Sequence, residues 1–312
     1  MTIITNAYET YKIGSGGGLR ESLDNVIANI TPSDTVFLNR FKKGKAKSRY
    51  EEWIKDSLAA YADNAQLEGD TVAAVAITAP TRTGNNCQIV RKSFTISGTT
   101  EAVDLAGRKS EIAYQTAKQL KELAKDIEWS LSFGTGNSGT SAAARRMLGV
   151  VGTNGTDGWI TTNSYSGSGS AASEAGFNTL LQTIWKAGGK PQSAFVSGAN
   201  KKAISAFTGN STRWTDVDKL EAVNVVDVYK SDFGPVRIFL QRLFEQSQSS
   251  GSTPCKAAPI LQEDLWEIRT LRPTQVVPLA KTGDGEARMI VWEGTLVCRA
   301  EDGNGMLTGL GA

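Results

Sequence analysis

The amino-acid sequence predicts an α+β protein that combines one long helix, a projecting β-hairpin and a separate module of short strands and helices. Three observations carry this prediction. A helical apolar period runs over residues 110–133, two apolar stretches flank a weakly hydrophobic segment within 45–103, and strand and helix patterns alternate from residue 190 onward. A chain organised in this way exposes much surface that only partner chains can cover.

The composition is that of a folded chain, and it excludes several classes of protein. Hydrophobic residues make up 40% and charged residues 21% of the 312 residues, and the 34 basic and 32 acidic side chains nearly balance. Without histidine, a Ser-His-Asp triad and a His-ligated zinc site are excluded. No apolar run approaches the roughly 18 residues of a membrane helix, and the N-terminus lacks the features of a secretory signal.

The three cysteines, Cys87, Cys255 and Cys298, are far apart and form no Cys-x-x-Cys pair. This spacing predicts separate reduced thiols and synthesis in the cytosol. The glycine-rich stretch at 14–18 lacks the Gly-Lys-Ser/Thr of a phosphate-binding loop, and the acidic residues around Gly285 lack the other ligands of a calcium loop. We therefore expect no cofactor, no metal site and no enzymatic activity.

Residues 1–44 predict an extended arm. The glycines at 14–18 form a hinge, residues 19–30 carry apolar residues at helical spacing, and Pro32 ends that helix. A cluster of six basic residues follows within ten positions. Its members are Arg40, Lys42, Lys43, Lys45, Lys47 and Arg49. Such a cluster is typical either of contact with nucleic acid or of a solvated or intersubunit segment that meets acidic residues of a neighbour.

Residues 45–103 predict a long hairpin. Its first strand contains Tyr50, Trp53 and Ile54, its second spans Gln88 to Val103, and the tip at 59–86 has few residues that could build a core. An isolated hairpin is barely stable in water, so we expect this one to rest on another chain. Trp53 and Ile54 are the best candidates for that apolar contact.

Residues 110–133 predict the longest helix, about 36 Å long at 1.5 Å per residue. Ser110 is suited to the N-cap, Glu111 complements the helix dipole, and Gly134 can end the helix. Apolar residues recur at steps of three and four residues, and Thr116 occupies the one position of this period that is not apolar. The expected core side chains are Ile112, Leu120, Leu123, Ile127 and Leu131.

The rest of the chain predicts shorter elements. Residues 134–172 are rich in Gly, Ser and Thr and predict long loops, and a helix is expected at 173–187. Beyond residue 190 we expect a helix at 200–207 and several strands. The expected strands are 194–196, 223–229, 236–240, 266–271 and 287–299.

Several sequence blocks resemble one family of proteins. Glu52-Trp53-Ile54-Lys55-Asp56-Ser57-Leu58-Ala59 with the later Glu68-Gly69 is similar to the start of the hairpin in the tailed-phage major capsid proteins. Six further blocks resemble the long helix, the segment that leads into it, and the C-terminal part of that family. They lie at 97–99, 106–115, 121–128, 271–273, 278–284 and 293–297. Together, in this order and spacing, they extend the resemblance from about residue 31 to the end.

The resemblance implies the Hong Kong 97-type capsid fold. It implies an N-terminal arm at 1–44, an extended loop (E-loop) at 45–103, a peripheral (P) domain at 104–185 with its spine helix at 110–133, and an axial (A) domain at 186–283. A return strand of the P domain at 284–301 and a C-terminal segment at 302–312 complete the expected division.

The resemblance also implies a function in assembly. In that family, subunits form the hexamers and pentamers of an icosahedral head around double-stranded DNA, and arms and E-loops lap over neighbours. Copies of the chain itself are then the main partners, portal, scaffolding or decoration proteins are further ones, and DNA is contacted without sequence specificity. We expect the protein in the virion, assembled in the host cytoplasm, with scaffolding supplied from elsewhere or unnecessary, and without covalent crosslinks between subunits.

Two alternatives remain open at this stage. An encapsulin-like compartment would use the same fold to enclose protein cargo. A monomeric surface-binding module, from a different class, is suggested by the loops rich in Gly, Ser and Thr, but it would leave the long hairpin and the arm without a reason to be ordered.

Overall fold

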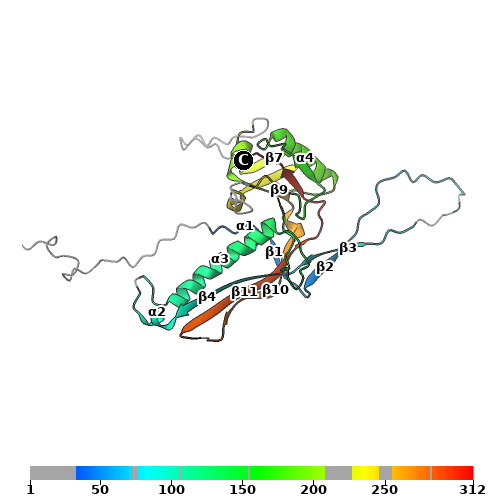
Figure 1. Cartoon of the computed structure of the whole chain (residues 1–312). Helices are drawn as coiled ribbons and strands as arrows, with labels where there is room; N and C mark the ends of the chain where they lie inside the picture. Colours follow the sequence, from blue (N-terminus) through cyan, green and yellow to red (C-terminus); the bar gives the residue numbers. More distant parts are fainter. Residues whose placement is uncertain are drawn as a thin grey trace, which may run out of the picture.

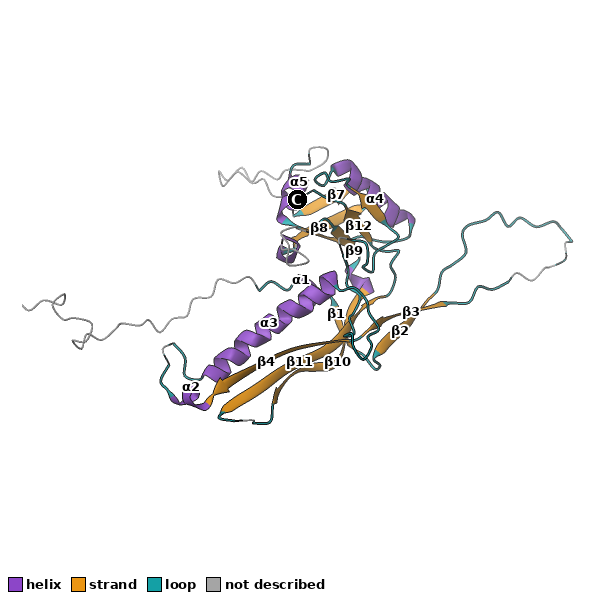
Figure 2. Cartoon of the chain, in the orientation of Figure 1, coloured by secondary structure: helices purple, strands orange, loops and turns teal. Residues whose placement is uncertain are grey.

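The computed structural model describes residues 33–69, 71, 76–105, 107–153, 155–207, 227–245, 255–281 and 283–311. Within these residues the chain forms two separate sheets, a long helix beside the first sheet, and a two-stranded ribbon that leads a loop away from the body (Figures 1 and 2). The helix predicted at 19–30 and the glycines at 14–18 lie outside the described residues.

The first sheet has four strands in the order β1-β10-β11-β4. Its bounds are β1 Lys42–Lys45, β10 Trp266–Pro278, β11 Gly285–Cys298 and β4 Gln88–Ser97. β1 runs parallel to β10, whereas β10, β11 and β4 are antiparallel to their neighbours. The helix α3 (Glu111–Phe133) runs alongside this sheet (Figure 1), and the short helix α2 (Gly98–Ala102) connects to it from β4.

The long helix confirms the prediction from the sequence almost to the residue. The Ser110 side chain accepts a hydrogen bond from the N–H of Ala113, and Gly134 takes the C-cap position after Phe133. Leu123, Ile127 and Leu131 are buried, because the apolar period of three and four residues places them on the same face.

The second sheet has six strands in the order β5-β12-β9-β6-β8-β7. Its bounds are β5 Ser164–Ser166, β12 Gly305–Thr308, β9 Ala258–Leu261, β6 Ser193–Val196, β8 Gly234–Leu240 and β7 Val228–Ser231. The helices α4 (Glu174–Lys186) and α5 (Gly198–Ser205) accompany it, with 3-10 turns at Arg242–Glu245 and Glu263–Leu265. Its hydrophobic cluster contains Phe177, Leu181, Ile184 and Ile260.

The two sheets meet around the C-terminal end of α3. The larger hydrophobic cluster joins Leu131 and Phe133 of the helix to Phe195 of β6 and Phe244 of the turn after β8. Phe133 and Phe244 have ring centroids 5.7 Å apart. Burial of these aromatic rings therefore fixes α3 against both sheets.

The projecting ribbon differs from the predicted hairpin in its second strand. β2 (Tyr50–Lys55) pairs with β3 (Thr81–Asn86), whereas the apolar stretch expected to return the hairpin is β4, which pairs with β11. The reason is burial, because Val90 and Ile96 of β4 are buried in the body of the protein. The hairpin with its loop is therefore 50–86, rather than the whole of 45–103.

The end of the predicted arm belongs to the core. The helix α1 (Val36–Arg40) buries Phe37 completely, and Phe41, stacked on Trp266 at 5.5 Å, is also buried. β1 then joins the first sheet. These apolar side chains hold residues 36–45 against the body, so the expectation of an extended arm does not apply to them.

Two other expected boundaries also differ from the observed packing. The helix α4, expected in the unit 104–185, is packed in the hydrophobic cluster of the six-stranded sheet, because Leu180 and Ile184 are buried there. The strand β12 places the segment 302–312 in the same sheet, and Met306 and Leu307 are buried. Residues 134–172 include the short strand β5, and the strand expected at 223–229 is observed as β7, whose described part begins at Val228, whereas 223–226 lie outside the described residues.

Candidate intersubunit contact surfaces

The basic segment 40–49 lies on the edge of the four-stranded sheet. It begins at the end of α1 and includes β1, which pairs with β10 and with no other strand of the described residues. The strand alternation leaves most of its charged side chains exposed. Positive charges on an edge strand disfavour pairing with a further strand, so the segment is suited to side-chain contacts rather than to sheet extension.

Two of the six basic residues form ion pairs within the chain. The Arg40 guanidinium lies 2.6 Å from Glu263 and stacks over the Phe239 ring, 3.8 Å from its centroid. The Lys42 ammonium lies 2.8 Å from Asp264, and both side chains are largely exposed. Arg40 therefore links α1 to β8 and to the turn Glu263–Leu265 of its own chain, and its contact with another subunit stays a prediction.

The other four basic side chains, Lys43, Lys45, Lys47 and Arg49, are exposed, and the described part of the chain offers none of them an ion pair. These four positive charges are therefore available for contact with another molecule. Nearby Arg269 is instead neutralised within the chain, at 2.6 Å from Glu51 and 3.2 Å from Glu267.

The base of the ribbon separates the two apolar contact residues predicted from the sequence. Trp53 is partly buried and packs on Trp159, with ring centroids 5.4 Å apart. Ile54, the next residue of β2, points to the other face and is 73% exposed. Ile54 is thus free for a neighbour, whereas Trp53 anchors the ribbon to its own chain.

The loop between β2 and β3 exposes apolar side chains almost completely. Leu58, Tyr61, Leu67 and Ile77 are 98%, 109%, 82% and 97% exposed, respectively. The described residues of this loop form no helix or strand (Figure 2). Its sequence at 56–80 contains four acidic residues and neither lysine nor arginine. Apolar side chains in such a loop have no core of their own to join.

The predicted core of α3 is correct for four of its five residues. Leu123, Ile127 and Leu131 belong to the large hydrophobic cluster, and Leu120 is partly buried against it. Ile112 is only partly buried and lies in neither described cluster.

The sequence analysis missed a buried carboxylate on α3. Glu128 is 1% exposed, and its Oε1 accepts hydrogen bonds from the N–H of Phe37 at 2.8 Å and from the Gln241 amide at 2.7 Å. Its Oε2 accepts one from the N–H of Leu38 at 2.9 Å. The position of Glu128 in the helix could have indicated its burial. It lies four residues after the apolar Ala124 and next to the buried face formed by Ile127 and Leu131.

Glu128 connects three parts of the fold through these bonds. Burial raises the pKa of its carboxyl, while the hydrogen bonds from Phe37, Leu38 and Gln241 act in the opposite direction without cancelling that rise. The bonds tie the beginning of α1, the long helix and the end of β8 to one side chain. Its role is structural, because no exposed surface gives a substrate access to it.

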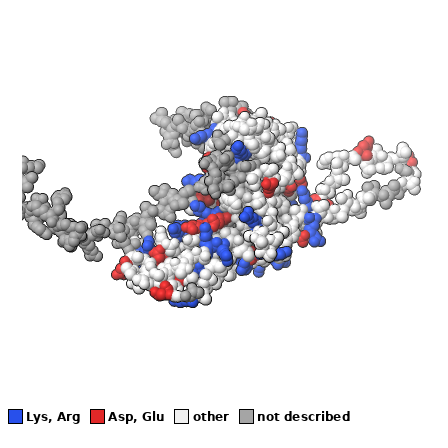
Figure 3. Space-filling model, viewed as in Figure 1, with Lys and Arg blue, Asp and Glu red and all other residues white. Residues whose placement is uncertain are grey.

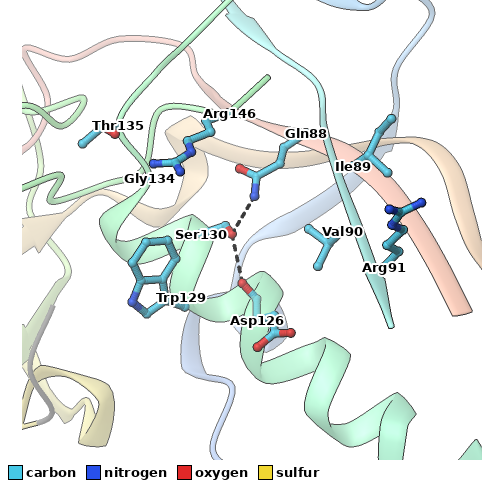
Figure 4. A pocket seen from close by; sticks show the side chains of 10 residues that line it. All are labelled: Gln88, Ile89, Val90, Arg91, Asp126, Trp129, Ser130, Gly134, Thr135 and Arg146. Atoms are coloured by element: carbon cyan, nitrogen blue, oxygen red, sulfur yellow. Dashed lines mark hydrogen bonds between the residues drawn. The ribbon is translucent and has the colours of Figure 1, made fainter. Parts of the chain in front are cut away.

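A groove opens between α3 and β4, with a volume of about 410 Å³. Figure 4 shows Trp129 on the helix side, Arg91 and Ile89 on the strand side, and Arg146 at the upper end. Trp129 is 37% and Ile89 44% exposed. The groove therefore offers aromatic and apolar surface beside two positive charges.

The described residues contain no arrangement that indicates catalysis. They hold no group of three or more Cys, Asp or Glu side chains that could bind a metal ion. All three cysteines are buried, and burial raises the pKa of Cys87 to about 11 and that of Cys298 to about 12. These two thiols therefore stay protonated and unreactive at neutral pH. None of the described helices is both long and apolar enough to cross a membrane.

A family model described as SU10 major capsid protein matches residues 3–311, nearly the whole chain. The chain belongs to the SU10 major capsid protein family. As a member it is a structural protein of a viral capsid, which agrees with the exposed ribbon and loop and with four basic side chains that form no ion pair with a described residue.

A curated relative supports this placement of the capsid protein. The major capsid protein of Escherichia phage Phieco32 is 30% identical over 112 residues, which cover 36% of this chain. The aligned part spans about a third of that relative's length, 32%. The match therefore supports the family assignment, and the chain spans about a third of the length of this relative.

Solved structures show that the capsid protein has the Hong Kong 97-type fold. The capsid of a native GTA particle has a TM-score of 0.67 at 10% identity, covering 98% of this chain and 100% of its own. Mycobacterium phage Adephagia has a TM-score of 0.61 at 12% identity, covering 98% and 99%. The fold predicted from the resemblance is confirmed.

The fold is shared with an encapsulin. The SrpI encapsulin complex of Synechococcus elongatus PCC 7942 has a TM-score of 0.55 at 10% identity, with 94% and 92% of the two chains covered. This similarity is lower than that to the phage and GTA capsids, and it leaves the family assignment unchanged.

Proposed function

We propose that this capsid protein assembles with copies of itself into the hexamers and pentamers of an icosahedral phage head that encloses double-stranded DNA. The observation that carries this proposal is the ribbon β2–β3 with its loop, whose apolar side chains are almost fully exposed. Such a loop is stabilised when a neighbouring subunit buries it. Many weak contacts of this kind, repeated by symmetry, hold a closed shell together.

The observed packing supports the following division into the domains of the capsid fold. We assign the E-loop to 50–86, and the P domain to α3 with the four-stranded sheet. We assign the A domain to the six-stranded sheet, which takes in α4 and the segment 302–312 by its hydrophobic cluster. In this arrangement A domains meet around the axes of the hexamers and pentamers, and E-loops lie over neighbours.

The basic edge and Ile54 serve as contact surfaces in this proposal. Lys43, Lys45, Lys47 and Arg49 supply charge pairing between subunits or inward contact with packaged DNA, since none of them has an ion pair among the described residues. A net charge of +2 supports a shell that contains DNA without binding it tightly. Replacing all four by glutamine and measuring assembly against salt separates the two roles, because only contact between subunits affects DNA-free particles.

The chain acts in this proposal as a structural protein without enzymatic activity, in the virion, after assembly in the host cytoplasm. Portal, scaffolding or decoration proteins are its other partners. Covalent crosslinks between subunits are not needed, because the proposed surfaces are apolar and ionic.

The particle mass of the purified protein tests the proposal directly. Mass photometry with negative-stain images should find closed shells, or discrete hexamers and pentamers. A single species near the 33.3 kDa of one chain, unchanged by concentration and salt, would contradict it and favour a monomeric surface-binding module.

An encapsulin-like compartment is the second candidate function, because the fold similarity extends to the SrpI shell. The contents of native particles distinguish the two. Nuclease-protected double-stranded DNA supports the phage head, whereas a single co-purifying enzyme inside DNA-free particles supports the compartment.

A further inference from the structure

Within the described residues, the chain passes three times between the two sheets. The connections are 134–163 between α3 and β5, 262–265 between β9 and β10, and 299–304 between β11 and β12. The backbone N–H of Arg299 donates to the oxygen of Leu265 at 3.0 Å, so the second and third connections run side by side. We refer to the turn 299–304 as the joint of the two sheets.

A buried amide holds the joint in shape. Asn304 is 0% exposed, and its Oδ1 accepts hydrogen bonds from the N–H of Gln262 at 3.0 Å and from the indole N–H of Trp266 at 2.9 Å. Its Nδ2 donates to the backbone oxygen of Ala300 at 2.9 Å. The joint therefore cannot change its shape without the loss of buried hydrogen bonds, which are costly to leave unmade.

The first connection is bonded to the same turn. The Asn163 amide donates to the backbone oxygen of Asp302 at 2.8 Å. Thr161 and Thr162 each donate to the Glu301 carboxylate through the backbone N–H and the hydroxyl, at distances between 2.7 and 3.1 Å. All three connections thus converge on the joint, so a change in the angle between the two sheets acts on it.

The ribbon β2–β3 is attached to the first sheet at its inner end. The Glu51 carboxylate lies 2.6 Å from the Arg269 guanidinium of β10. On β3, the Asn85 amide donates to the backbone oxygen of Leu296 in β11 at 2.7 Å, and its oxygen accepts from the N–H of Leu148 at 2.9 Å. Since Asn85 is only 3% exposed, these bonds are firm, and the inner end of the ribbon follows the first sheet.

The outer end of the ribbon is attached to the joint. The alternation of β2 places Trp53 and Lys55 on the same face as Glu51. Trp53 packs on Trp159 of the first connection, and the Lys55 ammonium lies 2.8 Å from the Asp302 carboxylate of the joint. Figure 3 shows basic and acidic side chains next to one another where the ribbon leaves the body, beside the joint (Figure 1).

We propose that the ribbon is a brace between the first sheet and the joint, so that the direction of the ribbon and the angle between the two sheets change together. The Lys55–Asp302 ion pair and the Trp53–Trp159 contact carry this coupling, because they join a rigid strand pair to a turn that is itself rigid. The inference concerns a single chain and goes beyond the proposed function, since it requires no neighbouring subunit.

Distances between spin labels in the unassembled subunit test the brace. Labels at Lys118→Cys on α3 and Lys202→Cys on α5 report the angle between the sheets without touching the ribbon, and the native cysteines are buried. Lys55→Asp sets two carboxylates against each other, so the population outside the wild-type distance should rise by roughly twofold to fivefold. Exchanging the charges in Lys55→Asp/Asp302→Lys should restore the wild-type distribution.

The matched control is a charge reversal that stays within the ribbon. Arg82 of β3 pairs with Glu52 of β2 at 3.5 Å, so Arg82→Glu should leave the distance between the two labels unchanged. Lys55 and Asp302 are 32% and 47% exposed, so their variants should fold and keep the melting temperature of the wild type.

The outcomes separate the brace from the proposed function. An unchanged label distance in Lys55→Asp, an equal change in Arg82→Glu, or a change that the exchanged pair does not restore would overturn the brace and leave assembly standing. Wild-type protein that stays monomeric would overturn the proposed function, whereas the response of the labels in single subunits would still support the brace.

Discussion

The backbone N–H of Phe37 donates a 2.8 Å hydrogen bond to Oε1 of Glu128, across 91 residues of sequence. The same carboxylate accepts a bond from the Gln241 amide at the end of β8. One buried side chain thus joins the segment that enters the body, the long helix and the six-stranded sheet. The relative position of the two sheets depends on this junction together with the aromatic cluster around Phe133 and Phe244.

Replacing Glu128 by alanine should lower the free energy of unfolding by roughly 3 kcal/mol, because two buried donors and one partly buried donor lose their acceptor. Glu128→Gln should cost less, since the amide oxygen can still accept from Phe37 and Gln241. Urea unfolding of the unassembled subunit measures both. The matched control, Glu122→Ala at a partly exposed carboxylate of α3, should change the value by less than about 0.5 kcal/mol. An equally small effect of Glu128→Ala would contradict the conclusion that Glu128 joins these three segments.

Ile127→Asp should abolish the soluble subunit, because it places an unpaired charge in the hydrophobic cluster at a side chain only 4% exposed. Soluble yield after expression and particle formation are the measurements. Lys121→Asp, at an exposed position earlier on the same helix, should remain soluble. Normal yield and normal particles from Ile127→Asp would refute the assignment of the helix core.

Trp53 and Ile54 are adjacent in β2, but their variants should affect different properties. Trp53→Ala removes the packing on Trp159 and should lower the free energy of unfolding by about 2 kcal/mol. Ile54→Asp alters an exposed side chain and should leave unfolding unchanged while it weakens assembly. Denaturant unfolding and mass photometry on both variants provide the comparison. The reverse pattern would show that the two faces of the ribbon have been exchanged.

Glu301 should make the subunit less stable in acid. Burial by itself raises the pKa of its carboxyl, but four hydrogen bonds from the backbones and hydroxyls of Thr161 and Thr162 outweigh it, so the pKa lies below the usual value. The unfolded chain then binds the proton more readily, and the stabilisation present near neutral pH is lost as the pH falls through the folded pKa.

Glu301→Gln should reduce the loss of stability between neutral and acid pH. It should also lower the free energy of unfolding at neutral pH by about 1–2 kcal/mol, as expected for hydrogen bonds to a charged group. Unfolding curves from pH 7 down to about pH 3 measure the slope. Glu128 contributes the opposite slope, because its raised pKa favours the folded state at low pH. If the free energy of unfolding of Glu301→Gln falls with pH as steeply as that of the wild type, the acid sensitivity belongs to other carboxylates.

Much of the fold followed from patterns that are local in sequence. The period of three and four residues placed Leu123, Ile127 and Leu131 on one buried face, and Ser110 and Gly134 marked the helix ends. Blocks such as Glu52 to Ala59 carried the resemblance to the capsid family. These features could be predicted because helix periodicity and capping depend on neighbours a few residues apart.

The pairing of the strands was decided by the tertiary structure. An apolar stretch such as Gln88–Ser97 fits a hairpin and a core sheet equally well by its sequence, and only burial beside α3 assigned it to the core. In the same way, the sequence did not distinguish Arg40 from Lys43 within the basic cluster. The structure distinguishes them, because Arg40 forms an ion pair with Glu263, 223 residues away.

The sequence alone therefore determined the long helix, the existence of a projecting hairpin and the capsid family. The tertiary structure decided which charges remain unpaired, which strand closes the hairpin, and where Glu128 finds its donors. The physical reason is the range of the interactions, because ion pairs, buried hydrogen bonds and strand partners join residues that the chain separates by tens to hundreds of positions.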